Sequence, residues 1–225
     1  MRRIGILGGM GPEATILLMQ KVLAAVPARD DGDHVPLIVH QNPQVPSRIA
    51  ALIEGTGESP GPALAAMARD LEACGCSALA MPCNTAHAWA DEIRAATPLP
   101  FLDMIALSAD ALAAAGVRRA GLLASPATRR AQVFDAPFAA RGLAPVHAED
   151  EAELLAVIRA VKAGHDPAAL APRFERLARA LAARSDRLLV ACTEFSLLAP
   201  RLPADIAWTD SLDCLVSAIV AEAQR

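Results

Sequence analysis

Short apolar runs alternate with longer amphipathic stretches through the first half of the chain. The runs Arg3–Leu7 and Val35–His40, and the run that ends before Cys83, have the length and composition of buried strands. The stretches between them predict helices, which are expected at Pro12–Val26, Ser47–Glu54, Pro62–Cys74 and Thr85–Ala96. This alternation of strand and helix predicts a parallel sheet with right-handed crossovers.

The same order repeats after a proline-rich turn at Thr97–Pro100. Phe101–Met104 is expected to open the second set, with Ser125–Thr128 as a loop. Further strands are expected at Arg119–Ala124, Ala144–His147, Leu188–Ala191 and Ile206–Trp208, and helices at Ala106–Ala115, Gln132–Arg141, Glu151–Ala163, Pro167–Arg184, Glu194–Leu198 and Ser211–Ala223. The sequence predicts an α/β fold of two pseudo-symmetric Rossmann-like lobes with parallel four-stranded sheets. The lobes are expected to comprise residues 1–98 plus 209–225 and residues 99–208, with the active site in the cleft between them.

Composition narrows the class of protein. The 225 residues carry a formal net charge of −4 and no basic tract, which argues against a nucleic-acid partner. No run approaches the roughly 18 apolar residues of a membrane span, so a cytoplasmic protein without membrane contact is expected. The five cysteines are expected to be free thiols. Only two lysines are present, Lys21 and Lys162, and neither lies in a loop that suggests a Schiff base with pyridoxal phosphate.

Two cysteines occupy matching places in the two halves. Cys83 and Cys192 each follow an apolar strand and precede small polar residues that open a helix. Ligands of open α/β sheets bind beyond the carboxyl ends of the strands, so we expect both thiols to face one substrate. A helix N-terminus at that place favours a thiolate. The alternative is that both are buried structural cysteines, but their matching positions favour a function.

Residues near these cysteines can bind a carboxylate. Asn84, Thr85 and Thr193 offer side-chain and backbone donors suited to an anion. The compact ammonium of Lys162 also suits a carboxylate partner. Arg48 lies near the end of the second expected strand, although an isolated arginine is usually a solvated surface residue.

The glycine-rich segment Gly9–Ala14 fits the dinucleotide pattern GxGxxG/A and follows a strand. That pattern also requires an acidic residue at the end of the second strand, where this chain has His40–Asn42. Pro12 stands where a phosphate would need a backbone N–H. We therefore expect the loop, with Met10 in it, to approach a small substrate closely.

No metal or cofactor is expected. Cys74, Cys76, Cys83 and His87 fit no common zinc-ligand spacing. Cys74, Cys76 and Cys214 are expected to be packing residues. Three roles remain open for His87: a helix cap, a core residue or a donor to the cleft.

Five motifs in this order resemble the aspartate/glutamate racemase family, the cofactor-independent amino-acid racemases. They are Gly8-Gly9-Met10-Gly11-Pro12-Glu13-Ala14-Thr15, the segment from Asp33-His34-Val35-Pro36 to Asn42-Pro43-Gln44-Val45-Pro46, Met81-Pro82-Cys83-Asn84-Thr85-Ala86-His87, Lys162-Ala163-Gly164 and Cys192-Thr193-Glu194. Each motif alone is modest evidence, and the set in this order is specific.

The resemblance implies roles for particular residues. Cys83 and Cys192 would be the paired acid and base that move a proton at Cα of aspartate or glutamate. Arg48 and Lys162 would bind the distal carboxylate. The α-carboxylate and amino group would be held by Asn84, Thr85 and Thr193, and the substrate site would also include Met10, Thr128 and Glu194. The resemblance also implies a homodimer.

Two departures from the family pattern bear on the substrate. The segment Leu122–Thr128 has serine and Pro-Ala where the family often has threonine and glycine, and Phe134 stands roughly where a tyrosine is usual. The motif that ends at Glu194 reads Cys-Thr-Glu, whereas the glutamate racemases of cell-wall synthesis typically carry Cys-Thr-His. This favours the aspartate branch.

Other functions remain open on the same scaffold. The alternatives among enzymes are a broad-specificity amino-acid racemase, a hydantoin racemase or a maleate-isomerase-like enzyme. Related decarboxylases carry one of the two cysteines, so the presence of both argues against that branch. A non-catalytic protein that binds a small carboxylate is an alternative of another class.

Overall fold

The structure, a computed structural model, describes residues 1–225 and contains two parallel four-stranded sheets. The first sheet has the strand order β2-β1-β3-β4. Its strands are β1 (Ile4–Gly8), β2 (Leu37–Gln41), β3 (Ala78–Ala80) and β4 (Phe101–Leu102). All residues of β1 and β3 are buried, as expected for strands that helices cover on both faces.

The second sheet repeats this topology with the order β6-β5-β7-β8. Its strands are β5 (Arg119–Ala124), β6 (Ala144–His147), β7 (Arg187–Ala191) and β8 (Trp208–Asp210). Strand β3 is therefore equivalent to β7, and these are the two strands that lead to Cys83 and Cys192. The predicted fold class, two pseudo-symmetric parallel α/β lobes, is confirmed.

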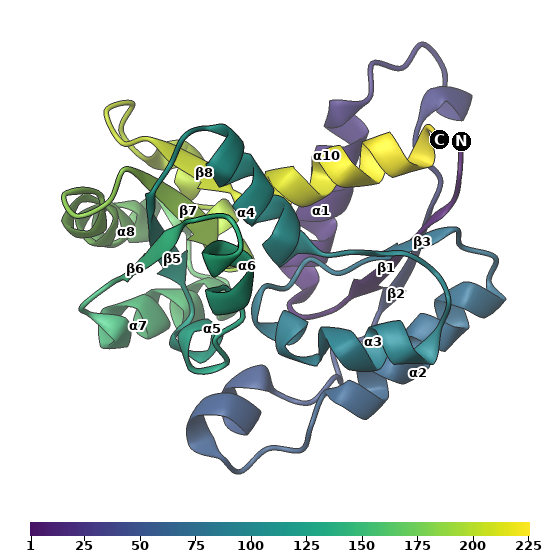
Figure 1. Cartoon of the computed structure of the whole chain (residues 1–225), viewed down its shortest axis with the longest axis horizontal. Coiled ribbons are helices and arrows are strands. Elements are labelled where there is room, and N and C mark those ends of the chain that lie inside the picture. Colours follow the sequence, from purple (N-terminus) through teal and green to yellow (C-terminus); the bar gives the residue numbers. More distant parts are fainter.

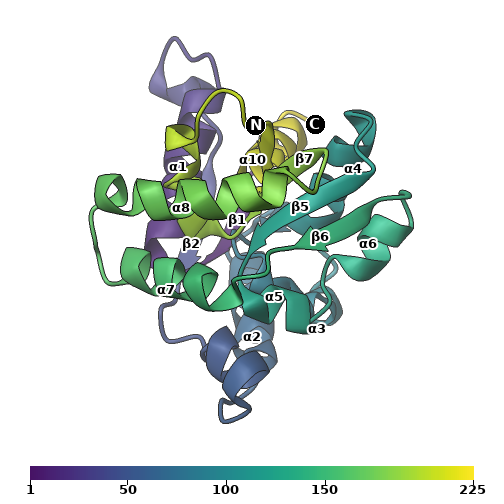
Figure 2. The same cartoon turned by 90° about the vertical axis from the view of Figure 1, so that its left-hand side faces the viewer.

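Helices cover both faces of each sheet (Figures 1 and 2). The larger helices are α1 (Pro12–Ala25), α2 (Gly61–Ala73), α3 (Ala90–Ala96), α4 (Met104–Ala114), α7 (Glu151–Lys162), α8 (Pro167–Ala182) and α10 (Ser211–Ala223). Short ones are α5 (Pro126–Arg130), α6 (Asp135–Ala139) and α9 (Thr193–Ser196). Helices α1 and α10 share one apolar cluster with the first sheet, and α7 and α8 share another with the second. No helix is long and apolar enough to cross a membrane.

The C-terminal helix returns to the first lobe. Strand β8 belongs to the second sheet, but Leu212, Leu215 and Ile219 of α10 pack in the core of the first. The two chain ends lie side by side (Figure 1), where the Arg2 N–H donates to the Ala223 carbonyl at 2.7 Å. Helix α10 thus ties the two lobes together.

One predicted strand lies in a different lobe from the one expected. Phe101 was expected to open the second set, but β4 pairs with β3 and forms an edge of the first sheet. Leu79 pairs with Phe101 and Ala80 with Leu102 in the parallel register. The break between the sheets therefore follows Leu102, at the start of α4.

Local signals explain the other differences. Gln132 has φ 53°, in the left-handed region, which breaks the helix expected over Gln132–Arg141 and leaves the shorter α6. Ser125 accepts a hydrogen bond from the Ala127 N–H and caps α5, so part of the expected loop at Ser125–Thr128 is helical. The helix expected over Ser47–Glu54 contains a π-helical turn, η2 (Ala50–Glu54).

Candidate active site

A cavity of about 670 Å³ lies between the lobes and contains both predicted cysteines. The first lobe contributes the loops that follow β1 and β2, together with Cys83 and Thr85. The second lobe contributes Ser125, Ile158 and Lys162, together with Cys192 and Glu194. Each cysteine is 7% exposed. The equivalent strands β3 and β7 therefore bring one thiol from each lobe to one shared space.

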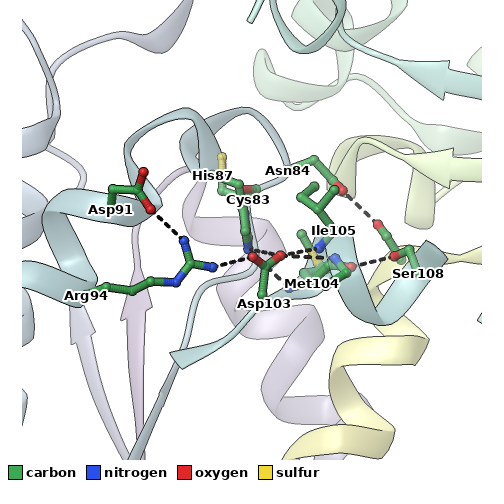
Figure 3. Close-up of polar contacts among 11 residues, drawn as sticks. Cys83, Asn84, His87, Asp91, Arg94, Asp103, Met104, Ile105 and Ser108 are labelled. Atoms are coloured by element: carbon green, nitrogen blue, oxygen red, sulfur yellow. Dashed lines mark hydrogen bonds and ion pairs between the residues drawn. The ribbon is translucent and has the colours of Figure 1, made fainter. Parts of the chain in front are cut away.

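Cys83 lies three residues beyond β3, in a segment without regular structure that leads into the 3-10 helix η3 (Thr85–Trp89). The Cys83 N–H donates to the Met81 carbonyl at 2.9 Å. The Cys83 carbonyl is 2.8 Å from Nδ1 of His87, which lies one turn further on (Figure 3). Of the roles left open for His87, the structure shows a buried side chain that contacts the backbone of this cysteine.

Cys192 follows β7 directly and is the N-cap residue of α9. Its thiol donates to Oε2 of Glu194 at 2.9 Å, and Lys162 Nζ is 2.5 Å from Glu194 Oε1. These contacts link a thiol, a carboxylate and an ammonium in a row. The sequence motif Cys-Thr-Glu places the carboxylate two residues from the thiol, and α7 supplies the lysine from another part of the lobe.

The thiolate expected at Cys192 is not favoured by these surroundings. Burial raises the pKa of the Cys192 thiol well above its usual value, and the Glu194 carboxylate raises it further. Helix α9 has only four residues, so it contributes little of the helix dipole on which the expectation depended. These surroundings therefore favour the neutral thiol of Cys192 over the thiolate.

Lys162 keeps its charge in the cavity. Partial burial favours the neutral amine, but the adjacent Glu194 carboxylate outweighs this and raises the pKa of Lys162. Arg48, from the first lobe, is half-buried and also lines the cavity, and its Nη1 donates to the carbonyls of Val45 and Pro46 at 3.2 and 3.1 Å. Because a guanidinium has five N–H donors, these two bonds leave others for an anion.

The substrate-binding residues predicted from the sequence fall into two groups. Those that line the cavity are Met10, Arg48, Thr85, Lys162 and Glu194. Asn84, Thr128 and Thr193 are each 2% exposed and do not line it. Asn84 Nδ2 donates to Ser211 Oγ at 3.0 Å, and the Thr128 hydroxyl is 2.9 Å from that of Thr85. Asn84 and Thr128 thus bond to other side chains of the protein, while Asn84 Oδ1 is buried without a hydrogen-bond partner.

The glycine loop has the tight geometry that its composition indicates. Gly9 has φ +93°, and a Cβ there would lie 2.4 Å from the backbone of Asn42. The Gly9 N–H donates to Thr15 Oγ1 at 2.9 Å, which fixes the loop to the start of α1. Gly9 therefore lies close to the backbone that follows strand β2. Gly11 lines the cavity, and a Cβ added to it would lie 3.6 Å from Lys162 Nζ.

Some lining residues were not predicted as site residues. They include Glu13, Gln44, Ser47, Ser125 and Ile158. Glu13 lies inside the quoted glycine motif, and Gln44 inside the motif that follows β2, so their place in these motifs was the available signal. Ile158 precedes Lys162 by one helical turn, and this spacing puts both on one face of α7.

Three of the five cysteines lie away from the cavity, and all five are free. Cys76 is buried in the first lobe's core, and Cys214 is half-buried on α10. Cys74 was expected to pack but is exposed, because it is the C-cap residue of α2, where the helix reaches the surface. The prediction of free thiols is confirmed, and that of a packing role for Cys74 is wrong.

Fold and site together define a class of protein: two parallel α/β lobes of like topology, with one cysteine from each lobe at a shared cavity. The family model described as Asp/Glu/Hydantoin racemase matches residues 7–219, and the chain belongs to this family. It is an isomerase of the amino-acid racemase class, which confirms the resemblance found in the motifs.

Named relatives cover essentially the whole chain. The broad specificity amino-acid racemase RacX of Bacillus subtilis (strain 168) is 24% identical over 223 residues, 97% of this chain and 96% of the relative. The solved aspartate racemase of Picrophilus torridus has a TM-score of 0.91 and 30% identity, over 100% of this chain and 95% of that one. An aspartate racemase homologue from Pyrococcus horikoshii OT3 has a TM-score of 0.79 and 22% identity over the full length of both chains, which shows the shared fold.

Proposed function

We propose that this chain interconverts the L- and D-forms of an acidic amino acid, aspartate or glutamate, by proton transfer between two thiols and without a cofactor. The observation that carries the proposal is the placement of Cys83 and Cys192 at equivalent strand ends in one cavity. Racemisation by two groups needs a base on one face of Cα and an acid on the other. Two thiols from opposite lobes meet that requirement.

In the proposed reaction, the Cys83 thiolate takes the α-proton and the Cys192 thiol donates its own proton to the opposite face of the carbanion. The electron pair of the broken C–H bond forms the new C–H bond, and the charge moves from Cys83 to Cys192. The Lys162 ammonium contacts the same Glu194 carboxylate as Cys192 does, and it offsets the new negative charge. The reverse reaction, or proton exchange with solvent, restores the starting form.

The α-proton is very weakly acidic, so most of the rate acceleration must come from stabilising the carbanion. Arg48 and Lys162 supply the positive charge that lines the cavity. In the proposal they bind the substrate carboxylates, with Arg48 directed at the distal one. The enclosed position of the two thiols strengthens these electrostatic interactions, because little water screens them.

The experiment follows the α-proton by NMR in deuterated water, starting from each pure enantiomer of aspartate and of glutamate. The wild-type protein should replace the α-proton with deuterium and racemise the substrate. Cys83→Ala and Cys192→Ala should each abolish racemisation, while each retains deuterium exchange with one enantiomer only, because one base remains. Cys74→Ala, which changes an exposed thiol outside the cavity, is the matched control and should behave as wild type.

Substantial racemisation by either single cysteine variant would contradict the two-thiol mechanism. Product that forms without solvent deuterium at Cα would contradict proton exchange. Binding of aspartate or glutamate with no exchange and no racemisation by the wild-type protein would favour the non-catalytic alternative.

The charges of the cavity support a second candidate, a broad-specificity racemase. Arg48 and Lys162 carry positive charge, but Glu13 and Glu194 line the same cavity, so the formal charges cancel. A cavity in which two glutamates match the arginine and the lysine also suits amino acids with neutral side chains, and the Bacillus relative is named as a racemase of broad specificity. A chirality assay on aspartate, glutamate and a panel of neutral amino acids distinguishes the two candidates.

A further inference from the structure

The segment that carries Cys83 needs support from outside its own strand. Strand β3 ends at Ala80, and Met81–Asn84 has no regular structure. A thiol that transfers a proton must be held at a defined distance from Cα, since a displacement of about 1 Å can cost a factor of 10² in rate. A contact with another element must therefore fix this segment.

His87 contacts the segment with one ring nitrogen and a second element with the other. Its Nε2 is 3.2 Å from the N–H of Met104, at the start of α4. A backbone N–H can only donate, so Nε2 must accept and the ring proton lies on Nδ1. The Nδ1–H therefore donates to the Cys83 carbonyl at 2.8 Å. The imidazole thus bridges the Cys83 segment and α4 (Figure 3).

The α4 end of this bridge is itself fixed. The Asp103 carboxylate caps α4 by accepting from the N–H groups of Ile105 and Ala106, and it forms an ion pair with Arg94 (Figure 3). Burial lowers the pKa of His87, and the Asp103 carboxylate, 3.9 Å from Nε2, opposes this only in part. The ring is therefore neutral and keeps its acceptor for Met104.

Cys192 is held differently, although its strand is equivalent. The Cys192 carbonyl accepts from the backbone N–H of Phe195 at 2.8 Å, within the turn that opens α9. The Cys192 carbonyl is therefore held by a backbone N–H, whereas the Cys83 carbonyl is held by a side chain. A substitution at His87 therefore disturbs one thiol of the pair and spares the other.

We propose that His87 is a positioning residue that fixes the Cys83 thiol against the start of α4 through its hydrogen bond to the Cys83 carbonyl. This inference deepens the proposed two-thiol function and depends on it. His87 touches no substrate in this role, and it transfers no proton. Its effect is confined to reactions in which Cys83 is the base or the acid.

The test uses the single-cysteine proteins, in which each enantiomer reports on one thiol. His87→Leu, which removes both ring contacts, is placed in the Cys192→Ala protein and in the Cys83→Ala protein. Deuterium exchange at Cα is measured with the amino acid that the wild-type protein prefers. Exchange should fall by about 10- to 100-fold where Cys83 is the remaining base. Where Cys192 is the remaining base, exchange should stay within about threefold of its rate with His87 intact, because Cys192 should move by much less than about 1 Å.

Two further variants separate positioning from general damage. His87→Asn places an amide N–H near the position of Nδ1, so it should restore most of the exchange lost in His87→Leu. His147→Leu is the matched control, because His147 is a half-buried histidine of β6 that lies outside the cavity. It should leave exchange by both thiols unchanged. Thermal unfolding of every variant checks that the protein remains folded.

Equal loss of exchange in the two single-cysteine proteins would overturn the positioning role, and so would a His87→Asn protein as impaired as His87→Leu. These results differ from a failure of the proposed function. If the single-cysteine proteins show no enantiomer-specific exchange even with His87 intact, the two-thiol mechanism itself is wrong.

Discussion

Glu194 makes the two thiols of the cavity chemically unequal. Its carboxylate accepts a hydrogen bond from the Cys192 thiol with one oxygen and contacts the Lys162 ammonium with the other. A carboxylate next to a thiol disfavours the thiolate, and burial acts in the same direction. In the proposed reaction, Cys192 therefore begins as the acid.

Replacing Glu194 by glutamine should lower the pKa of Cys192. The glutamine amide carries no charge and can donate to a thiolate, so the thiolate fraction at a given pH rises. The measurement is the pH dependence of iodoacetamide alkylation at Cys192, followed by peptide mass spectrometry. The midpoint should move to lower pH in Glu194→Gln.

Lys162→Met is the control, because it should shift the pKa of Cys192 in the opposite direction. The Lys162 charge lowers the pKa of Cys192, so its removal should move the midpoint to higher pH. A midpoint that is unchanged or raised in Glu194→Gln would show that the carboxylate does not set the state of this thiol.

The sequence predicted which residues gather at the site better than it predicted their contacts. Cys83, Cys192 and Lys162 were all placed at the cavity, because strand ends and motif order fix their positions. The thiol–carboxylate contact of Cys192 was not predicted, because it depends on the side-chain conformation of Glu194. For the same reason Asn84 was expected to face the substrate, although its amide donates to Ser211.

At the scale of the element, Asp210 joins three parts of the structure. It ends β8 and caps α10, with Oδ1 accepting from the Leu212 N–H at 2.8 Å and from Ser196 Oγ of α9 at 2.9 Å. Its Oδ2 is buried without a hydrogen-bond partner, and Lys21 Nζ is 3.9 Å away. Burial raises the pKa of this carboxyl group to about 6.

The raised pKa predicts a pH dependence of stability. Between about pH 4 and 6 the folded protein binds the Asp210 proton more tightly than the unfolded chain does. The free energy of unfolding therefore falls as the pH rises through this window, by up to about 3 kcal/mol from this residue. Asp210→Asn keeps an acceptor for both hydrogen bonds and should remove this part of the dependence.

Urea unfolding of wild type and Asp210→Asn at pH 4.5 and pH 7 measures the difference. Asp91→Asn is the control, because the Asp91 side chain is 95% exposed, and it should keep the wild-type dependence. An Asp210→Asn protein with the full wild-type dependence would show that another group is responsible.

The elements themselves were largely predictable, and the errors have physical causes. The bounds of α10 at Ser211–Ala223 agree with the prediction, since an aspartate cap and a long apolar pattern mark them. Strand β4 has two residues, and a run this short carries no signal of which sheet it joins. The break at Gln132 depends on a left-handed backbone in a residue other than glycine, which composition does not indicate.

At the scale of the whole molecule, the lobes meet through few side-chain contacts near the cavity. The hydroxyls of Thr85 and Thr128 are 2.9 Å apart, one from each lobe. Arg130 on α5 also donates to the Ile53 carbonyl of η2 at 3.1 Å. These contacts are where the relative position of the two thiols can be disturbed without changing either cysteine.

A double-mutant cycle of Thr85→Val and Thr128→Val should show a coupling energy of about 1 kcal/mol in the free energy of unfolding, the typical value for one hydrogen bond. Chemical denaturation of the four proteins gives this energy. A cycle of Thr85→Val with Thr209→Val serves as the comparison, because Thr209 lies on β8 and makes no hydrogen bond with Thr85. That cycle should be additive, and equal coupling in both cycles would contradict a specific contact between the lobes.

The like topology of the two sheets encloses two cysteines with unlike surroundings, His87 at one and Glu194 with Lys162 at the other. In the proposed reaction, thermodynamics limits how far this difference can change the kinetics of the two enantiomers. Mirror-image amino acids have equal free energies in water, so kcat/KM must be the same in both directions, whatever the residues around each thiol do. The asymmetry can only divide that ratio differently between kcat and KM for the two hands. A saturated enzyme can therefore turn over one enantiomer faster, but only with a KM for that enantiomer that is higher in the same proportion.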